Sequence, residues 1–258
     1  MKIKILIPIF NDFESVSKLL MDINSTLSNL NADFSVILVN DASTEKNNID
    51  VSNTDKINSI KIINIKNNQG HARCIATGLK YIFDNEEFDY IIPMDGDGED
   101  RPQEISKFVE FFKYDDTKPI VGERIKRSEG LVFKISYTIH KLVTFIFTGH
   151  SIKFGNYTCL PKSTVEKMIN EKATWSSFSG ALAKLEKNRS TIPSIRGERY
   201  FGPSKMSFFN LIKHSLSIIA VFKTNVIIRS ILFFLIYIFL ISENLNYVTS
   251  IPLIGVLA

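Results

Sequence analysis

Three carboxylates follow an apolar run near the middle of this chain of 258 residues. The run ends at Met94, and Asp95, Asp97 and Asp100 come directly after it. At the carboxyl end of a buried parallel strand, such side chains face the crevice in which open α/β sheets bind ligands. Asp95 and Asp97 suit Mg2+ or Mn2+, hard cations that take oxygen ligands from protein, water and a diphosphate. The pattern predicts a divalent-metal site, and the alternative is an acidic loop that water solvates.

Short β-rich runs alternate with helical patterns through the first half of the chain. Strands are expected at 2–8, 34–40, 60–65 and 90–94, and helices at 15–30, 72–83 and 103–112. This alternation predicts a Rossmann-like α/β fold with a mostly parallel sheet and helices on both faces. The polar segment 43–59 is expected to be a loop or an irregular helix. With 45% hydrophobic and 22% charged residues, the composition excludes a disordered chain.

The second half is more apolar and ends in two helical patterns of different kinds. An aromatic-rich helix is expected at 131–148, followed by short alternating elements at 154–160, 163–170 and 179–188. The segment 206–222 mixes large apolar residues with Lys213 and His214, which predicts an amphipathic helix lying at a membrane surface. An ordinary surface helix packed on the sheet is the alternative.

A nearly continuous apolar stretch at 226–241 follows that amphipathic segment. With Lys223 as a snorkelling flank, it approaches the ~20 residues that span a bilayer, and a buried core helix is the alternative. A second apolar stretch at 247–258 is too short to cross, so we expect an incomplete second span. The predicted organisation is a globular domain at 1–205, an interfacial helix at 206–224 and a membrane region at 225–258.

Basic residues are unevenly distributed, although the net charge is only +4. Residues 199–229 contain five Lys and Arg residues and no Asp or Glu. This favours an anionic partner, and the apolar neighbours favour a membrane over nucleic acid. The same basic residues before the span, with Glu243 after it, predict an N-terminal domain on the cytoplasmic face of the cytoplasmic membrane. Cys74 and Cys159 form no disulfide framework, which agrees with a reducing compartment.

Four polar motifs follow successive expected strands. They are Pro8-Ile9-Phe10-Asn11-Asp12, Val39-Asn40-Asp41-Ala42-Ser43-Thr44, Asn67-Asn68-Gln69-Gly70-His71-Ala72-Arg73 and Asp95-Gly96-Asp97. Their order and spacing resemble the inverting family 2 glycosyltransferases of the nucleotide-sugar type, whose usual forms are Pro-x-Tyr-Asn-Glu, Val-Asp-Asp-Gly-Ser, Asn-x-Gly-x-x-x-Ala and Asp-x-Asp. The resemblance implies a GT-A type fold at 1–205, a metal-dependent transferase and a UDP- or GDP-linked sugar as donor.

The resemblance also implies roles for individual residues of these motifs. Pro8 and Asn11 belong to the nucleotide-sugar site, Asp12 and Asp41 contact ribose or base, Gly70 and Arg73 line the diphosphate, Asp95 holds the nucleotide and the metal, and Asp97 holds the metal. Helix N-capping is the alternative for Asn11, Asp12 and Asp41. Tight packing against the next helix is the alternative for Gly70.

Residues of the second half extend the resemblance to the polyprenyl-phosphate glycosyltransferases, which include dolichol-phosphate mannose synthases and bactoprenol glucosyltransferases. The residues that carry it are Arg124, Arg127, Arg196, Arg199, Gly202, Ser204 and Lys205. The resemblance implies that the cations bind a lipid phosphate by charge-assisted hydrogen bonds, and contact with ordinary head groups is the alternative. Asn156-Tyr157-Thr158-Cys159 departs from the usual Asp-Phe-Arg-Leu, so Asn156 stands where the acceptor region has a carboxylate.

The expected reaction is direct displacement at the anomeric carbon with inversion. The metal and Arg73 would stabilise the departing nucleoside diphosphate. A lipid phosphate acceptor is already anionic and needs positioning more than deprotonation. A sugar hydroxyl on a lipid carrier would need a general base, for which Asp100 is the candidate, ahead of His140 and His150.

Two other functions remain as alternatives. A nucleotidyltransferase would also use an acidic metal site, but it should carry a glycine-rich basic loop where this chain has Asn11-Asp12-Phe13-Glu14. A non-catalytic membrane scaffold with the same fold is the other, and Asn156 and Arg101 are its hints. Homo-oligomerisation through the C-terminal helices is left open.

Overall fold

The computed structural model describes residues 1–112, 117–126, 131–203, 208–243, 246, 248–250 and 252. Three residues with an expected acceptor role, Arg127, Ser204 and Lys205, lie outside the described residues. Their roles therefore remain predictions.

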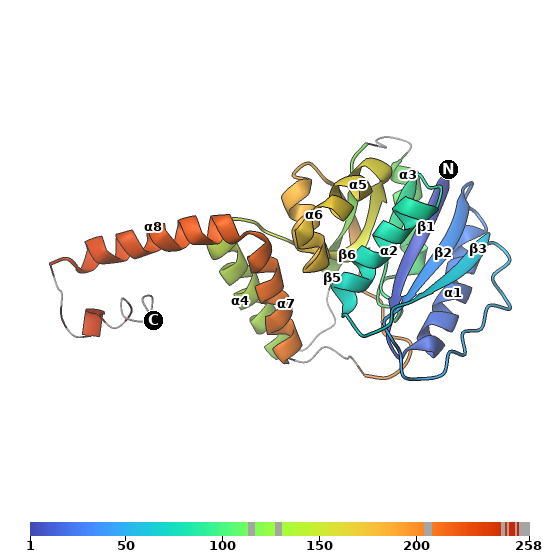
Figure 1. Ribbon diagram of the computed structural model, residues 1–258, viewed down its shortest axis with the longest axis horizontal. Helices are drawn as coiled ribbons and strands as arrows, with labels where there is room; N and C mark the ends of the chain where they lie inside the picture. The colour runs from blue at the N-terminus through green and yellow to red at the C-terminus, as the bar shows by residue number, and fades with distance from the viewer. Residues whose placement is uncertain are drawn as a thin grey trace.

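Seven strands form one sheet in the order β3-β2-β1-β4-β6-β5-β7 (Figure 1). Their bounds are β1 Lys2–Ile9, β2 Asp33–Asn40, β3 Ser59–Asn64, β4 Tyr90–Pro93, β5 Ile120–Lys126, β6 Phe154–Pro161 and β7 Ser190–Ile195. The first four strands are parallel, as are β5 and β7, and β6 runs antiparallel between β4 and β5. The predicted mostly parallel sheet is confirmed.

Helices form close to their expected positions. Their bounds are α1 Phe13–Leu27, α2 His71–Asn85, α3 Ile105–Phe111, α4 Leu131–Thr148, α5 Lys162–Asn170, α6 Phe178–Leu185, α7 Phe208–Val221 and α8 Lys223–Ile241, with short 3-10 turns η1 Pro102–Glu104 and η2 Lys172–Trp175. Residues 41–58, all of which the structure describes, contain no helix, so this segment is the loop and not the irregular helix.

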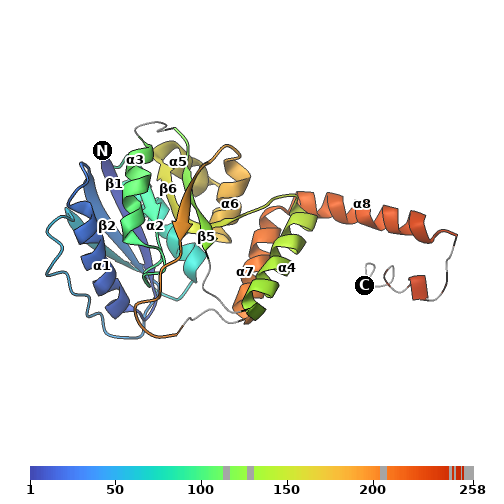
Figure 2. The same cartoon turned by 180° about the vertical axis from the view of Figure 1, so that it is seen from behind.

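Helices cover both faces of the sheet, as the sequence predicts. Figure 1 shows α2, α5 and α6 on one face, and Figure 2 shows α1 and α3 on the other. β1 illustrates why its sequence is apolar throughout: Ile5 and Ile7 pack into the core under α1 and α3, whereas Leu6 packs into the core under α2. Burial on both faces removes the alternation typical of half-exposed strands.

Two strands, β5 and β7, are not predicted by the sequence pattern. β5 carries the charged residues Glu123, Arg124 and Lys126 and lacks a continuous apolar run. β7 contains Pro193 and lies at the edge of the sheet, the position where a strand tolerates a residue that has no N–H to donate. Their long-range pairing, which periodicity does not report, stabilises both strands.

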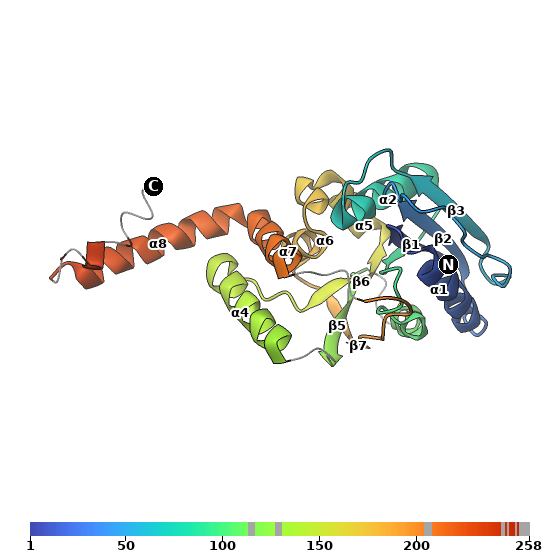
Figure 3. The same ribbon diagram turned by 90° about the horizontal axis from the view of Figure 1, so that it is seen from below.

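Beside the sheet, α4 contacts both α7 and α8. α7 also packs on α6, where Ile218 and Val221 are buried in one cluster with Ala183, whereas α8 extends away from the α/β layers (Figure 3). Large apolar side chains remain exposed on α4 and α7, with Leu142 58%, Phe145 52% and Leu216 60% exposed. We call the exposed apolar surface of α4 and α7 the apolar platform. Such a surface agrees with the predicted interfacial helix and marks an interaction with a membrane or another protein.

Among the described residues, one helix is long and apolar enough to cross a bilayer, namely α8, of 19 residues. Only 6% of its apolar window is buried, and α8 extends away from the sheet in Figures 1 and 3. A core helix would be mostly buried, so that alternative is wrong for α8. The helix remains the candidate membrane span.

Polar residues of α8 are bonded to the end of α4. Arg229 Nη1 donates to the carbonyl of Ile146 at 3.1 Å, and Asn225 Nδ2 donates to the carbonyl of Thr148 at 3.0 Å. The last carbonyls of a helix have no partner within it, so these two side chains satisfy groups that would otherwise need water. The next residue, Gly149, adopts φ 76, and a Cβ there would lie 2.6 Å from the Arg229 guanidinium.

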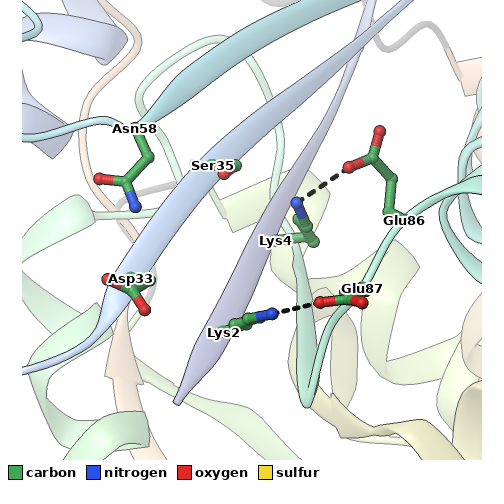
Figure 4. Close-up of a pocket in the computed structure, with 7 residues that line it drawn as sticks. All are labelled: Lys2, Lys4, Asp33, Ser35, Asn58, Glu86 and Glu87. Atoms are coloured by element: carbon green, nitrogen blue, oxygen red, sulfur yellow. Dashed lines mark hydrogen bonds and ion pairs between the residues drawn. The ribbon is translucent and has the colours of Figure 1, made fainter.

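The amino ends of β1 and β2 carry a charged cluster, made of Lys2, Lys4, Asp33, Glu86 and Glu87. It lies at the opposite end of the sheet from residues 95–100, which we call the acidic loop. It lines a depression of about 340 Å³ shown in Figure 4. Lys4 Nζ and Glu86 are 3.0 Å apart with side chains only 10% and 9% exposed, and Lys61 also reaches Glu86 at 2.6 Å. Lys2 also pairs with Glu87, so both lysines of the cluster are bound to carboxylates, which indicates a role in stability.

We expect Glu86→Gln to destabilise the protein by about 3 kcal/mol, because it leaves the buried Lys4 ammonium without a carboxylate. Lys4→Met is the matched variant and should cost less, about 1 kcal/mol, because Glu86 keeps Lys61. Urea unfolding of both variants measures the difference, and equal losses would contradict the assignment.

The same pair predicts an acid-sensitive contribution to stability. Burial acts to raise the pKa of Glu86, but hydrogen bonds from Lys61 and Lys4 lower it below its ordinary value. Its contribution is therefore complete above the unfolded-state pKa and is lost as the pH falls through the lower folded-state pKa. Unfolding of Glu86→Gln should show less loss of stability on acidification than the wild type.

Candidate active site

The four sequence motifs meet at one edge of the sheet. β1 lies between β2 and β4, so the chain connections leave this part of the sheet in opposite directions and open a crevice at the carboxyl ends of the strands. Asn11 and Asp12 follow β1, Asp41 follows β2, and Asp95 lies two residues beyond the end of β4. Gly70 immediately precedes α2. The crevice therefore collects side chains that are far apart in the sequence.

Asp41 joins the second motif to the third. Its carboxylate accepts hydrogen bonds from the backbone N–H groups of Gln69 at 2.7 Å and Gly70 at 2.8 Å, and its own carbonyl accepts one from Asn68 at 3.2 Å. Gly70 has φ 87, and among the described atoms a Cβ there would meet nothing within 4 Å. Tight packing is therefore the wrong explanation for this glycine, which is required by its backbone conformation.

Asn11 joins the first motif to the second. Its Oδ1 accepts from the backbone N–H groups of Thr44 at 2.8 Å and Glu45 at 3.2 Å. Asp12 occupies the N-cap position of α1, yet within the described chain its side chain makes no capping hydrogen bond. N-capping is thus the wrong explanation for Asn11 and Asp12. Asp41 is followed by the loop at 42–58 and not by a helix, so N-capping is also the wrong explanation for Asp41.

Asp95 is held by two side chains from other elements. Its Oδ1 lies 3.3 Å from His71 Nε2 and 3.4 Å from Asn156 Nδ2, and those two nitrogens are 2.7 Å apart. Asp100 stabilises the backbone of the loop, because its Oδ2 accepts a hydrogen bond from the Asp95 N–H at 2.9 Å. Arg124 lies 3.8 Å from the other oxygen of Asp100.

The acidic loop concentrates negative charge where water has little access. Burial and the Asp95 carboxylate raise the pKa of Asp97 to about 6 and that of Asp100 to about 7. Burial also acts to raise the pKa of Asp95, but His71 and Arg124 lower it overall. For His71, burial acts to lower the pKa, but the hydrogen bond to Asp95 and the negative charges of Asp95, Asp100 and Asp97 together raise it above its ordinary value. Carboxylates that raise each other's pKa in this way create a site that favours a cation.

Residues 196–201, which we call the strap, cross the acidic loop on the way from β7 toward α7. In Figure 2 the strap passes the carboxyl ends of the strands. Arg199 Nη1 lies 2.8 Å from Asp97 Oδ2, and Arg199 Nη2 pairs with Asp12. The structure thus places Arg199 between Asp97 and Asp12, two carboxylates that follow different strands of the crevice.

Backbone bonds hold the strap against the loop. Gly197 N–H donates to the carbonyl of Glu99 at 2.8 Å, and Tyr200 N–H donates to the carbonyl of Asp97 at 2.9 Å. Arg196 pairs with the Glu99 carboxylate, so this arginine too contacts the acidic loop. Two arginines that the resemblance assigns to a lipid phosphate, Arg196 and Arg199, are in this structure bound to the acidic loop.

The remaining predicted residues lie around the crevice. Pro8 is near the end of β1, and its carbonyl would lie 3.4 Å from a Cβ added to Gly96. Arg73 is exposed on the first turn of α2 and donates to the Gln69 side chain at 2.9 Å. Arg124 on β5 reaches the loop through Asp100. The structure therefore brings Arg124 to the acidic side of the crevice.

His71 is the residue that the sequence reasoning missed. It stands within the third motif, directly after Gly70, and that position at the start of α2 is the signal that places it beside Asp95. His150, considered as a base, instead stacks on Phe222 with ring centroids 4.3 Å apart, close to the joint between α4 and α8.

The oxygen ligands of the acidic loop fit a hard divalent cation. No three Asp, Glu, His or Cys side chains converge as a ready-made cage among the described residues. Mg2+ is commonly bound by one or two carboxylates together with water and substrate phosphates, and Asp95 and Asp97 suffice for that arrangement. A guanidinium already bridges Asp97 and Asp12, which shows that the place attracts positive charge.

Comparisons with known proteins agree with this architecture. Residues 4–178 match the family model described as glycosyl transferase family 2. The undecaprenyl-phosphate 4-deoxy-4-formamido-L-arabinose transferases of Salmonella choleraesuis and Salmonella paratyphi B are 28% identical over 82% of this chain. The match covers 64% of the length of each of these relatives.

Solved structures share the fold. The glucosyl-3-phosphoglycerate synthase of Mycobacterium tuberculosis, in complex with Mn2+, UDP-glucose and phosphoglyceric acid, superposes with TM-score 0.61 and 12% identity, covering 87% of this chain and 79% of that one. S. aureus TarS superposes with TM-score 0.52 and 14% identity, covering 77% and 37%. At these identities the likeness concerns the fold, which is of the GT-A type. Since the family model covers most of the chain, this protein belongs to glycosyl transferase family 2.

Proposed function

We propose that this protein is a membrane-attached inverting glycosyltransferase that moves a sugar from a nucleotide-sugar donor to a polyprenyl phosphate or a related lipid-linked acceptor. One observation carries the proposal: the crevice with Asp95 and Asp97 and the apolar platform of α4 and α7 belong to one chain, joined by the strap. The Salmonella relatives are named for transfer to undecaprenyl phosphate, which supports the acceptor class.

On the donor side, the chain's own groups bind and orient the nucleotide sugar. Asp12, Asp41 and Asn11 are the residues proposed to contact the base and ribose. Gly70, where a Cβ would meet nothing within 4 Å, is proposed to line the diphosphate. Arg73, on the exposed first turn of α2, adds positive charge toward the diphosphate. The structural neighbour that holds UDP-glucose favours a uridine donor over a guanosine donor.

Mg2+ or Mn2+, when bound, supplies the positive charge that neutralises the leaving diphosphate. Asp95 and Asp97 would hold it, and the neighbour crystallised with Mn2+ supports that choice. His71 and Asn156 orient Asp95 through its Oδ1. Asp100 fixes the loop through the Asp95 N–H. These contacts determine where the two carboxylates stand before a ligand arrives.

On the acceptor side, the geometry favours a lipid phosphate over a sugar hydroxyl. Asp100, the predicted base, is 5% exposed and engaged with the Asp95 N–H and Arg124, so it is poorly placed to take a proton from an acceptor. An anionic phosphate oxygen needs no base: it bonds to the anomeric carbon as the bond to the diphosphate oxygen breaks, and the nucleoside diphosphate leaves. Arg124 and Arg127 are the proposed phosphate-binding residues.

The proposed placement follows from the same elements. Residues 1–205 form the catalytic domain on the cytoplasmic face, 206–224 lie at the interface, and 225–258 belong to the membrane region. Support comes from the exposed apolar surface of α4 and α7 and from the nearly unburied α8.

We expect calorimetry on the detergent-solubilised full chain to show binding of UDP and UDP-sugars in Mn2+ and none in excess chelator. GDP and CMP are the matched controls and should bind at least about tenfold more weakly. Binding of GDP alone would mean that the donor carries guanine in place of uracil, and the protein would still be a glycosyltransferase. Absence of binding to every nucleotide in Mn2+ would favour the scaffold with a transferase fold.

A further inference from the structure

Arg199 occupies an unusual place for a residue of a lipid-facing segment. Its guanidinium contacts Asp97 and Asp12, which belong to different strand ends of the donor side. Building on the proposed function, we propose that Arg199 is an internal counter-ion of the donor site, bound to Asp97 when the metal is absent and exchanged for the divalent cation when donor and metal bind.

The carboxylates of Asp97 and Asp12 need a positive charge between them. Arg199, Asp97 and Asp12 have side chains only 13%, 18% and 20% exposed, so water screens their interaction poorly. Two carboxylates so shielded would repel each other without a cation between them. The guanidinium supplies one donor nitrogen to each carboxylate, a fork geometry that a lysine cannot reproduce.

Both carboxylate oxygens of Asp97 already have hydrogen-bond donors. Oδ1 accepts the Glu99 N–H at 3.1 Å and Oδ2 accepts from Arg199 at 2.8 Å. The bond to Glu99 is local to the loop and keeps its shape. A cation that binds Asp97 through Oδ2 must therefore displace Arg199, and the two positive charges compete for one carboxylate.

The backbone that carries Arg199 is packed tightly against the acidic loop. A Cβ on Gly98, whose φ is 89, would lie 2.5 Å from the Tyr200 ring, and a Cβ on Gly197 would lie 2.7 Å from the carbonyl of Gly98. Tyr200 also donates through its hydroxyl to Asp22 at 2.7 Å. The strap thus lies against the loop without space for a side chain between them. Arg199 can leave Asp97 by a change of rotamer while the strap stays bound.

A consequence for turnover follows. Once displaced, the guanidinium remains close to the crevice because the strap holds its backbone, so its charge becomes available to the leaving diphosphate. Arg199 therefore weakens the binding of metal alone and strengthens the interaction with metal and nucleotide together. The protein avoids a tightly bound metal in the absence of donor.

The test is direct titration of Mn2+ into the detergent-solubilised full chain, followed by the electron paramagnetic resonance signal of free Mn2+. Without nucleotide, Arg199→Gln should bind Mn2+ about tenfold more tightly than the wild type, and Arg199→Lys should lie between them. Arg196→Gln is the matched control, because Arg196 pairs with Glu99 and not with Asp97, and its affinity should stay within about twofold of wild type. With saturating UDP, the advantage of Arg199→Gln should shrink.

Equal or weaker Mn2+ binding by Arg199→Gln, with Arg199→Lys also unchanged, would overturn the proposal. An equal gain in Arg196→Gln would overturn it too, because the effect would then reflect net charge alone. If the wild type binds no Mn2+ even with UDP, the donor site itself fails. That result is distinct from a wild type that binds Mn2+ and an Arg199 variant that binds it no better.

Discussion

Replacing Asp97 with asparagine should lower glycosyl transfer about 1,000-fold while the protein stays folded. The change removes the charge that the metal needs, but it preserves the size of the side chain and an oxygen for the Glu99 N–H. The bond from Tyr200 N–H to the backbone carbonyl of residue 97 is also retained. Transfer of labelled sugar from the nucleotide donor in excess Mn2+ measures the loss.

Asp22→Asn provides the matched control for that experiment. Asp22 accepts the Tyr200 hydroxyl at 2.7 Å and so belongs to the support of the strap and not to the crevice. Its variant should keep activity within about fivefold of wild type, because a neutral amide oxygen still accepts the bond. Near-wild-type transfer by folded Asp97→Asn in excess Mn2+ would exclude Asp97 as a metal ligand.

The second large effect is expected from ending the chain after Thr224. Without α8 only the proposed interfacial attachment of α4 and α7 remains. The effective concentration of a membrane-embedded acceptor then falls, so transfer to that acceptor should drop about 100-fold. Nucleotide binding should persist, because both cores of the sheet are built without any residue of α8. Assays with acceptor in vesicles, beside calorimetry with UDP, separate the two effects.

A water-soluble short-chain acceptor is the control for the truncated protein. Transfer to it should change by less than about fivefold, because anchoring contributes nothing when both reactants are in solution. Equal activity of truncated and full chains on the vesicle-borne acceptor would rule out the anchoring role of α8. Loss of UDP binding would instead show that α8 stabilises the catalytic domain.

Much of the donor crevice could be predicted from the sequence, because its residues lie directly after strands that are apolar on both faces. β1 and β4 are examples, and their carboxyl ends locate Asp12 and Asp95. The antiparallel position of β6 and the edge strand β7 could not be predicted, since pairing between distant segments determines them and β7 contains Pro193.

The partner of Arg199 also lay beyond sequence reasoning. Arg199 and Asp12 are 187 positions apart, and composition alone associates this arginine with the basic residues that precede the membrane helix. Only the backbone bonds between the strap and the acidic loop place its guanidinium on the donor side. His71 was overlooked for a related reason: a motif lists neighbours along the chain, whereas Asp95 is its neighbour across the crevice.

In the proposed placement, the contact between α4 and α8 determines the distance between the crevice and the membrane surface. Asn225 and Arg229 lie near the beginning of α8, and both are bonded to the last carbonyls of α4. In that placement, these contacts at the start of α8 fix the distance between the crevice and the membrane surface. The length of α8 does not affect this distance. Lengthening α8 would change how deeply its far end penetrates and leave the distance from the crevice to the head-group plane unchanged.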